Sequence, residues 1–166
     1  GNLQTALNSA AAADTRLTHV IVVQAGATFT GPFTLPARAA GSGWVLLRSS
    51  AIASLPSEGS RAKATDVSNM AKITGPAGHG GAYVTNATGA HRYRFIGIEV
   101  APQAGTMTFV LIQITTGIFP HRFIFDRCYV HGDMSVGGRR GFFLNGDHFA
   151  VIDSSVLEFK EVSADT

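Results

Sequence analysis

The chain has little charge and almost no cysteine, and both shortages exclude classes of protein. Charged residues make up 14% of its 166 residues, and the net charge is +2. Globular chains typically carry about 25% charged residues. No basic run exceeds Arg139-Arg140, so nothing indicates a nucleic-acid partner. The single cysteine, Cys128, cannot form an internal disulfide, and no Cys/His zinc spacing is present.

Long apolar runs are also missing. None reaches the roughly 20 residues needed to cross a bilayer, so we expect no membrane span. The chain opens with Gly1-Asn2-Leu3 instead of a basic segment followed by an apolar one, so no signal peptide is visible and we expect a processed or trimmed product. The hydrophobic fraction of 45% is too high for a disordered chain. These features predict one globular domain over residues 1–166.

The residue patterns along the chain indicate one short helix followed by strands and turns. Residues 2–12 have apolar residues at helical spacing, and Asn2 can cap the start of this helix. Beyond Asp14, short runs rich in Val, Ile, Thr and Phe alternate with glycine-containing turns. Residues 50–71 are rich in Ser, Ala and Pro and are expected to form a long surface loop.

Three strand-like blocks repeat along the second half of the chain. They span residues 91–100, 121–130 and 148–156. The first two align without a gap, 30 residues apart, and Phe149 aligns with Phe123, 26 residues earlier. A period of 20 to 50 residues with strands in each unit is typical of a solenoid.

The alternation of apolar residues changes phase inside each block. Tyr93 and Phe95 share one face, but after Ile96-Gly97 the apolar pair is Ile98 and Val100. The switch comes at Asp126 in the second block and at residues 152–153 in the third. A strand of strict period two cannot do this without a bend. Each block is therefore predicted to be two strands joined by a corner, in a coil that stacks equivalent side chains into ladders.

The sequence resembles secreted right-handed parallel β-helix proteins of the pectate-lyase-like superfamily, especially those of environmental bacteria. The stretches that carry the resemblance are 2–8, 24–31, 93–99, 126–133, 141–145 and 151–155. It implies an all-β, right-handed parallel β-helix with a short N-terminal capping helix. It also implies a secreted or cell-surface protein whose partner is a polysaccharide. The superfamily includes lyases and hydrolases of acidic polysaccharides as well as binding and adhesive proteins, so no single activity follows.

The resemblance further implies C-terminal coils beyond Asp165-Thr166, because similar proteins continue through several more. The helix over residues 2–12 would close the first end of the coil, whereas an open second end would expose unpaired backbone and apolar side chains. The sequence is therefore expected to be a fragment, or a subunit that associates end to end with another copy.

One exterior patch is expected to carry the function. If Cys128 and Val130 face inward, the side chains at positions 127, 129, 131 and 133 face outward, and stacking brings positions 99 and 153 beside them. We call this set the second-block patch. Its members are Glu99, Arg127, Tyr129, His131, Asp133 and Asp153.

The patch suggests the chemistry of a polysaccharide lyase. β-Elimination needs a base and a cation that neutralises the substrate carboxylate, and we assign these roles to His131 and Arg127. Asp133 completes the catalytic set, while Glu99, Tyr129 and Asp153 would bind substrate. Ca²⁺ is conceivable as a cofactor, but no acidic cluster supplies its oxygen ligands, so no metal site is assigned. Glycoside hydrolysis would need a carboxylate pair roughly 5 to 10 Å apart, which nothing indicates.

Structural roles compete with each of these assignments. Arg127 and Asp153 could form an ion pair between adjacent coils, and Tyr129 could simply pack on the surface. Cys128 is expected to be an inert core residue, because burial raises a thiol pKa. The alternative function is a noncatalytic solenoid: an adhesin or a self-stacking filament subunit. Asn86-Ala87-Thr88 matches the glycosylation sequon, which chance also produces in Thr-rich chains.

Overall fold

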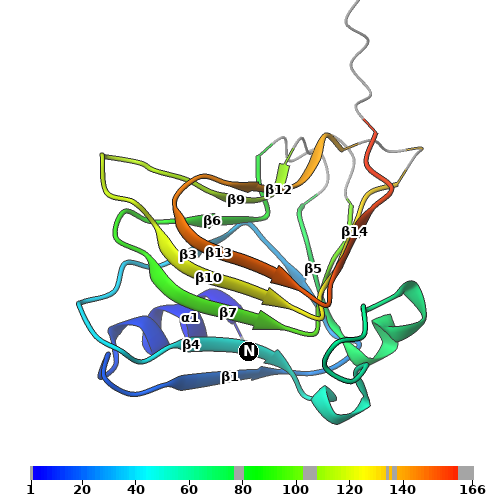
Figure 1. The fold of residues 1–166 in the computed structure, drawn as a ribbon, viewed down its shortest axis with the longest axis horizontal. Coiled ribbons are helices and arrows are strands. Elements are labelled where there is room, and N and C mark those ends of the chain that lie inside the picture. Colours follow the sequence, from blue (N-terminus) through cyan, green and yellow to red (C-terminus); the bar gives the residue numbers. More distant parts are fainter. Residues whose placement is uncertain (1, 77–80, 103–107, 134, 136–137, 161–166) are drawn as a thin grey trace, which may run out of the picture.

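The computed structural model describes residues 2–76, 81–102, 108–133, 135 and 138–160. The chain winds into a right-handed parallel β-helix of about four turns, with three parallel sheets along its sides (Figure 1). This confirms the fold class expected from the repeated blocks. No helix among the described residues is long and apolar enough to span a bilayer.

Each full coil contributes one strand to each sheet. The first sheet contains β1 (His19–Val23), β4 (Val45–Ser49), β7 (His91–Ile96), β10 (His121–Asp126) and β13 (Asp147–Ile152). The second contains β2 (Thr28–Thr30), β5 (Ala71–Thr74), β8 (Ile98–Val100), β11 (Tyr129–His131) and β14 (Ser155–Leu157). The third contains β3 (Phe33–Leu35), β6 (Val84–Asn86), β9 (Thr108–Ile112) and β12 (Arg140–Leu144).

A left-handed residue makes the corner between the first and second sheets in three successive coils. These residues are Gly97, Arg127 and Asp153, with φ of 63°, 46° and 48°. They lie where the alternation of apolar residues changes phase, so the predicted corners are confirmed. Positive φ costs a non-glycine residue roughly 1–2 kcal/mol. Arg127 and Asp153 therefore have to be held in place by their contacts.

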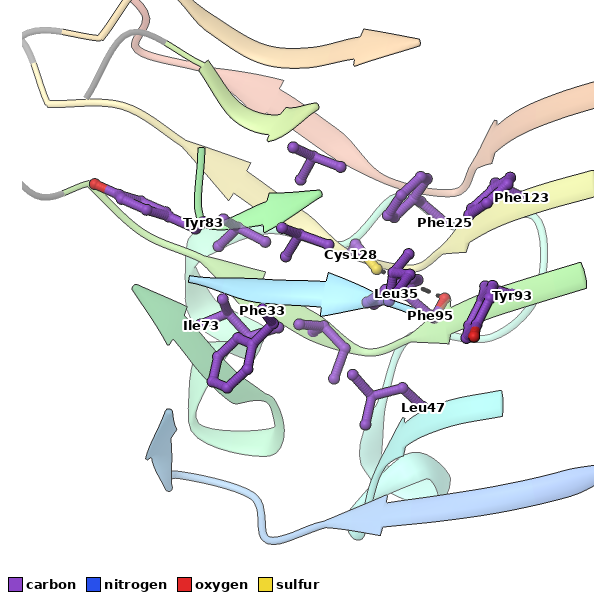
Figure 2. Packing of buried hydrophobic residues seen from close by; sticks show 14 of the residues in the cluster. Phe33, Leu35, Leu47, Ile73, Tyr83, Tyr93, Phe95, Phe123, Phe125 and Cys128 are labelled. Carbon is purple, nitrogen blue, oxygen red and sulfur yellow. Dashed lines mark hydrogen bonds between the residues drawn. The ribbon is translucent and has the colours of Figure 1, made fainter. Parts of the chain in front are cut away.

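Aromatic ladders fill the interior of the coil (Figure 2). Phe95 is in register with Phe125, and their rings stack 4.9 Å apart. Tyr93 and Phe123 stack in the same way at 5.7 Å. The next step of the Phe95 ladder is Val151. Its alignment with the two phenylalanines confirms the predicted register.

The N-terminal helix α1 (Leu3–Ala12) packs against β1 and β3 of the first coil. The side chain of Asn2 caps it by accepting the backbone N–H groups of Gln4 and Thr5. Leu3 and Leu7 are buried in the core. Gln4 also forms two hydrogen bonds of 2.8 Å to the backbone of Thr34 in β3. The helix therefore covers the interior at the first coil.

The insertion between β4 and β5, residues 50–70, packs over the corner that joins the first two sheets. It contains two short 3₁₀ helices, η1 (Ile52–Ser54) and η2 (Ala64–Asn69). Its buried residues Leu55, Ala62 and Met70 form a second apolar cluster with Ile96 and Tyr129. The sequence predicts only a surface loop here, whereas the segment adds a layer outside the coil.

Candidate functional site

The structure gives the second-block patch the strand register that the sequence predicts. Tyr129 pairs with Glu99 on one side and Ser155 on the other, and His131 pairs with Leu157. Cys128 and Val130 are buried in the interior. Burial raises the pKa of the Cys128 thiol to about 12, as expected for an inert core residue.

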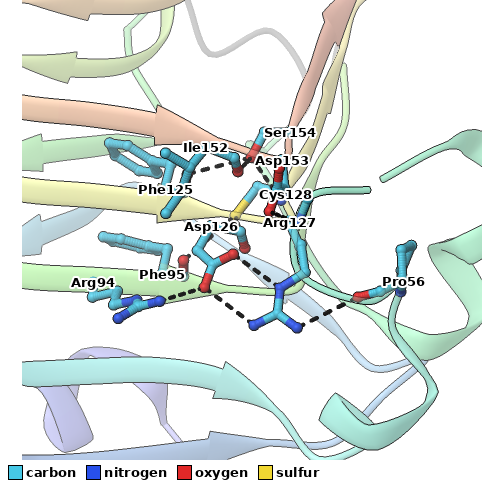
Figure 3. A network of polar contacts seen from close by, with 11 residues as sticks. Pro56, Arg94, Phe95, Phe125, Asp126, Arg127, Cys128, Ile152, Asp153 and Ser154 are labelled. Carbon is cyan, nitrogen blue, oxygen red and sulfur yellow. Dashed lines mark hydrogen bonds and ion pairs between the residues drawn. The ribbon is translucent and has the colours of Figure 1, made fainter. Parts of the chain in front are cut away.

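Arg127 is committed to a structural network at the corner (Figure 3). Its Nε and Nη2 atoms donate to the Asp126 carboxylate at 2.9 and 3.2 Å, and Nη1 donates to the carbonyl of Pro56 at 3.5 Å. Arg94 donates to the same carboxylate at 2.6 Å. Burial alone would raise the pKa of Asp126, but the hydrogen bonds from Arg127 and Arg94 outweigh it and hold the pKa below its usual value. All three nitrogens of Arg127 thus donate within the protein.

Asp153 anchors the insertion. Its Oδ2 atom accepts the backbone N–H of Gly59 at 2.7 Å, and its carbonyl accepts that of Ala62 at 2.8 Å. The sequence suggests an ion pair between Arg127 and Asp153 on adjacent coils. In the structure the ion-pair partner of Arg127 is Asp126. Asp153 therefore links the last described corner to residues more than 90 positions earlier.

Glu99 and His131 form a polar pair on the outer face of the second sheet. The Nε2 atom of His131 lies 3.0 Å from Oε1 of Glu99, and Nδ1 lies 3.0 Å from the carbonyl of Gly132. Lys72 contacts the same Glu99 oxygen at 3.2 Å. The hydrogen bond to Glu99 raises the pKa of His131, against the opposing effect of burial. A protonated His131 donates from both nitrogens, an arrangement that favours the cation over a free base.

Tyr129 is buried beneath the insertion, whereas Asp133 lies in a turn after β11. Tyr129 is 5% exposed because the insertion covers it, and its ring lies 4.7 Å from that of His131. Asp133 follows β11 and accepts the backbone N–H of Ser135 at 2.7 Å. The members of the patch therefore do not converge on one site. Arg127 and Tyr129 are covered by the insertion, Asp153 anchors the insertion, Glu99 pairs with His131, and Asp133 lies in a turn. No group of three or more His, Cys, Asp or Glu side chains in the described ranges could hold a metal ion.

The sequon residue Asn86 is buried within β6. Its amide nitrogen donates to the carbonyl of Gln113 at 3.0 Å, and its amide oxygen accepts the N–H of Gln113 at 2.8 Å. Both polar ends of the side chain therefore bridge to the next coil, and the side chain is not accessible for glycosylation.

A second surface, which the sequence does not reveal, lies on the outer face of the first sheet. Trp44, just before β4, lies beside Arg92, whose guanidinium carbon is 5.9 Å from the indole centroid. A shallow pocket of about 320 Å³ opens next to this ring. We call it the Trp44 patch. Its lining residues are Thr18, Trp44, Leu46, Arg94 and Ile124.

The register explains how this patch forms. Leu46, Arg94 and Ile124 are consecutive members of one outward ladder through β4, β7 and β10. The insertion lengthens the register offset between β4 and β7 to 48 residues, counted from Val45 to its partner Tyr93. That spacing lies outside the repeat of 26 to 30, which hides the alignment in the sequence.

Comparisons with protein-family models, curated proteins and solved structures found no match to this chain.

Proposed function

We propose that this chain is a secreted or cell-surface β-helix protein that binds an acidic polysaccharide at the Trp44 patch. The observation that carries the proposal is the combination of an indole ring, two neighbouring guanidinium groups and a shallow pocket on one face of a regular ladder. The resemblance to secreted β-helix proteins supports the proposed location.

The chemistry of the patch suits a sugar acid. The face of an indole ring packs well against the apolar C–H face of a sugar, and Leu46 and Ile124 extend this apolar floor. Arg94 pairs with Asp126 through Nη2 at 2.6 Å, but its side chain is 33% exposed, so the part of the guanidinium outside that pair can add a charge-assisted contact to a ligand carboxylate. Stacked strands lie about 4.8 Å apart, so successive coils present similar positions at the regular rise that an extended polymer requires.

Binding is favoured over cleavage because the groups assigned to β-elimination are already engaged. The nitrogens of Arg127 donate to Asp126 and Pro56. Both nitrogens of His131 have acceptors within the protein. A base needs a nitrogen free to take the substrate proton. Acidic polysaccharide recognition without cleavage is therefore the activity that these contacts support best.

The test is calorimetric titration with oligogalacturonate, with an uncharged oligosaccharide of equal length as reference. Trp44→Ala should weaken oligogalacturonate binding roughly tenfold or more, the equivalent of one stacking contact. His131→Gln, a matched change on the second sheet, should leave the affinity unchanged. Circular dichroism would establish that both variants are folded.

Two results would contradict the proposal. Absence of saturable binding to any uronate oligomer would refute acidic-polysaccharide recognition by this chain. Loss of binding in His131→Gln with unchanged Trp44→Ala would move the site to the second-block patch, where the sequence predicts it.

End-to-end self-association is a second candidate function. Among the described residues, β13 and β14 pair with a neighbouring strand on one side only. Their apolar side chains Val151, Ile152 and Val156 are 41 to 45% exposed. Edge strands with apolar residues favour pairing with another chain. Sedimentation velocity over a range of concentrations should then show a dimer or longer species that Val156→Lys abolishes, and a monomer at every concentration would refute it.

A further inference from the structure

A strongly cationic pocket lies at the corner where the chain passes from the third sheet to the first. Its volume is about 400 Å³. Arg38 follows β3, His91 and Arg92 begin β7, and His121 and Arg122 begin β10. We call it the Arg38 pocket. No Asp or Glu is among its lining residues, all of which lie in the described ranges.

Arg38 is a buried cation that forms no ion pair with any of the described residues. It is 8% exposed, and its Nη1 atom donates to the carbonyls of Gly43 and His91 at 2.9 and 3.4 Å. No described residue hydrogen-bonds its buried Nε and Nη2 atoms. Burial lowers the pKa of Arg38, and neighbouring Arg92 lowers it further. A buried guanidinium in this situation is costly unless a negative group compensates it.

Two histidines also line the pocket, and burial lowers the pKa of His91. The rings of His91 and His121 stack 4.9 Å apart and nearly parallel. Each Nδ1 atom faces a backbone carbonyl two residues earlier, at 2.9 Å for His91 and 3.2 Å for His121. The nearest carboxylate along the ladder is Asp147, the register partner of His121, and this exposed side chain pairs with His148 at 2.7 Å.

Arg92 and Arg122 place two more cations at matched positions of adjacent coils. Both have left-handed backbones, with φ of 58° and 61°. Arg92 donates to the carbonyl of Ser42 at 3.1 Å. Within the described residues Arg122 has no ion pair and donates no side-chain hydrogen bond. Like charges on adjacent strands are destabilising unless something neutralises them.

We propose that the Arg38 pocket binds a compact oxyanion, the carboxylate or sulfate group of a ligand. The negative group would lie between Arg92 and Arg122 and would compensate the charge of Arg38 beneath them. Guanidinium groups suit this ligand because their planar donors match the oxygens of both anions. This inference does not rest on the proposed polysaccharide function, because a free inorganic anion is a sufficient ligand.

The test is NMR titration of the side-chain signals of His91, His121 and the arginines with sodium sulfate and, separately, sodium galacturonate. Sodium chloride holds the ionic strength constant, and galactose is the uncharged reference. Saturable shifts at these side chains are expected for at least one anion. The anion with the higher affinity would identify sulfate or carboxylate as the preferred group.

Variants separate specific binding from a general effect of salt. Arg122→Gln, which removes no hydrogen bond within the described residues, should weaken anion binding roughly tenfold. Arg61→Gln removes the same charge from the insertion and should have no effect. Arg38→Met should abolish binding and, because it removes an uncompensated buried charge, should not lower the unfolding temperature without anion.

The inference would be overturned if neither sulfate nor galacturonate produced larger shifts than chloride, or if Arg122→Gln and Arg61→Gln bound the anion with equal affinity. Arg122→Gln changes no residue that lines the Trp44 patch and should retain oligogalacturonate binding there. This variant therefore distinguishes failure of the Arg38 pocket from failure of the proposed polysaccharide site.

Discussion

Asp126 shows how single residues hold the outside of this coil together. Its carboxylate is 2% exposed and accepts hydrogen bonds from Arg94 on the previous coil and from Arg127 at its own corner. The contact with Arg127 supports a left-handed residue, and Arg127 in turn donates to Pro56 of the insertion. One carboxylate thus links two coils, a strained corner and the outer layer.

Asp126→Asn should destabilise the fold by about 3 kcal/mol, because it leaves two guanidinium groups without their shared counter-ion. Since the folded pKa of Asp126 is lowered, its stabilisation is present at neutral pH and is lost as the pH falls through that folded value. Urea unfolding at pH 7 and pH 3 measures both effects. The difference in free energy of unfolding between wild type and Asp126→Asn should be smaller at pH 3 than at pH 7. An equal difference at both pH values would show that the Asp126 carboxylate does not stabilise the fold through its charge.

His131 should make folding stability depend on pH with the opposite sign to Asp126. Its pKa is raised in the folded state, so its stabilisation is complete below the unfolded value of about 6.5 and is lost as pH rises through the folded value. His131→Gln should therefore lose about 1 kcal/mol relative to wild type at pH 5.5 and little at pH 8.5. Urea unfolding at the two pH values measures this. The same pH dependence in variant and wild type would show that His131 does not contribute it.

At the scale of elements, the docking of the insertion depends on one glycine. A Cβ atom on Gly97 would lie 2.4 Å from Cδ1 of Leu55, so the insertion can seat Leu55 at this corner only because position 97 has no side chain. The corresponding corners of the next two coils carry Arg127 and Asp153. Glycine here serves both the positive φ and the close approach.

A double-mutant cycle tests this contact. Leu55→Ala should lower the free energy of unfolding by about 2 kcal/mol, because it leaves a cavity in the second apolar cluster. Gly97→Ala should cost more than the roughly 1 kcal/mol of its left-handed backbone, because it also displaces Leu55. In the Leu55→Ala background the cost of Gly97→Ala should fall to about that backbone value. Additive costs in urea unfolding would mean that the two residues do not interact.

Sequence patterns predict the strands of the second half of the chain well, for a physical reason. Residues that face a shared interior must be apolar at the same place in every coil, so the ladder of Phe95, Phe125 and Val151 is visible as a repeat. Outward positions carry no such constraint. The partnership of Arg94 with Asp126, residues 32 positions apart, is therefore not visible in the sequence.

The insertion limits prediction for a related reason. It lengthens one repeat and so conceals in the sequence the alignment of Leu46 with Arg94 of β7. Its own contacts depend on a few side chains without periodicity, among them Leu55 and Met70. The Arg38 pocket also escapes the pattern, because it assembles from residues at strand starts in two coils and from the segment after β3.

At the scale of the whole molecule, every function considered depends on parallel stacking of coils. The outward ladder Val20, Leu46, Arg94, Ile124 and Ala150 crosses the first sheet in four steps. The Trp44 patch lies along this ladder, and the Arg38 pocket lies at the end of the same sheet. If the stacking were different, neither surface would exist.

The most direct test is a spin-label distance between the two ends of this ladder. Val20→Cys and Ala150→Cys would be introduced together with Cys128→Ser, which removes the buried native thiol. Four steps of about 4.8 Å predict a backbone separation of about 19 Å, with a single narrow distribution between labels near that value. A broad distribution, or a separation beyond about 30 Å, would contradict a coil of five stacked strands.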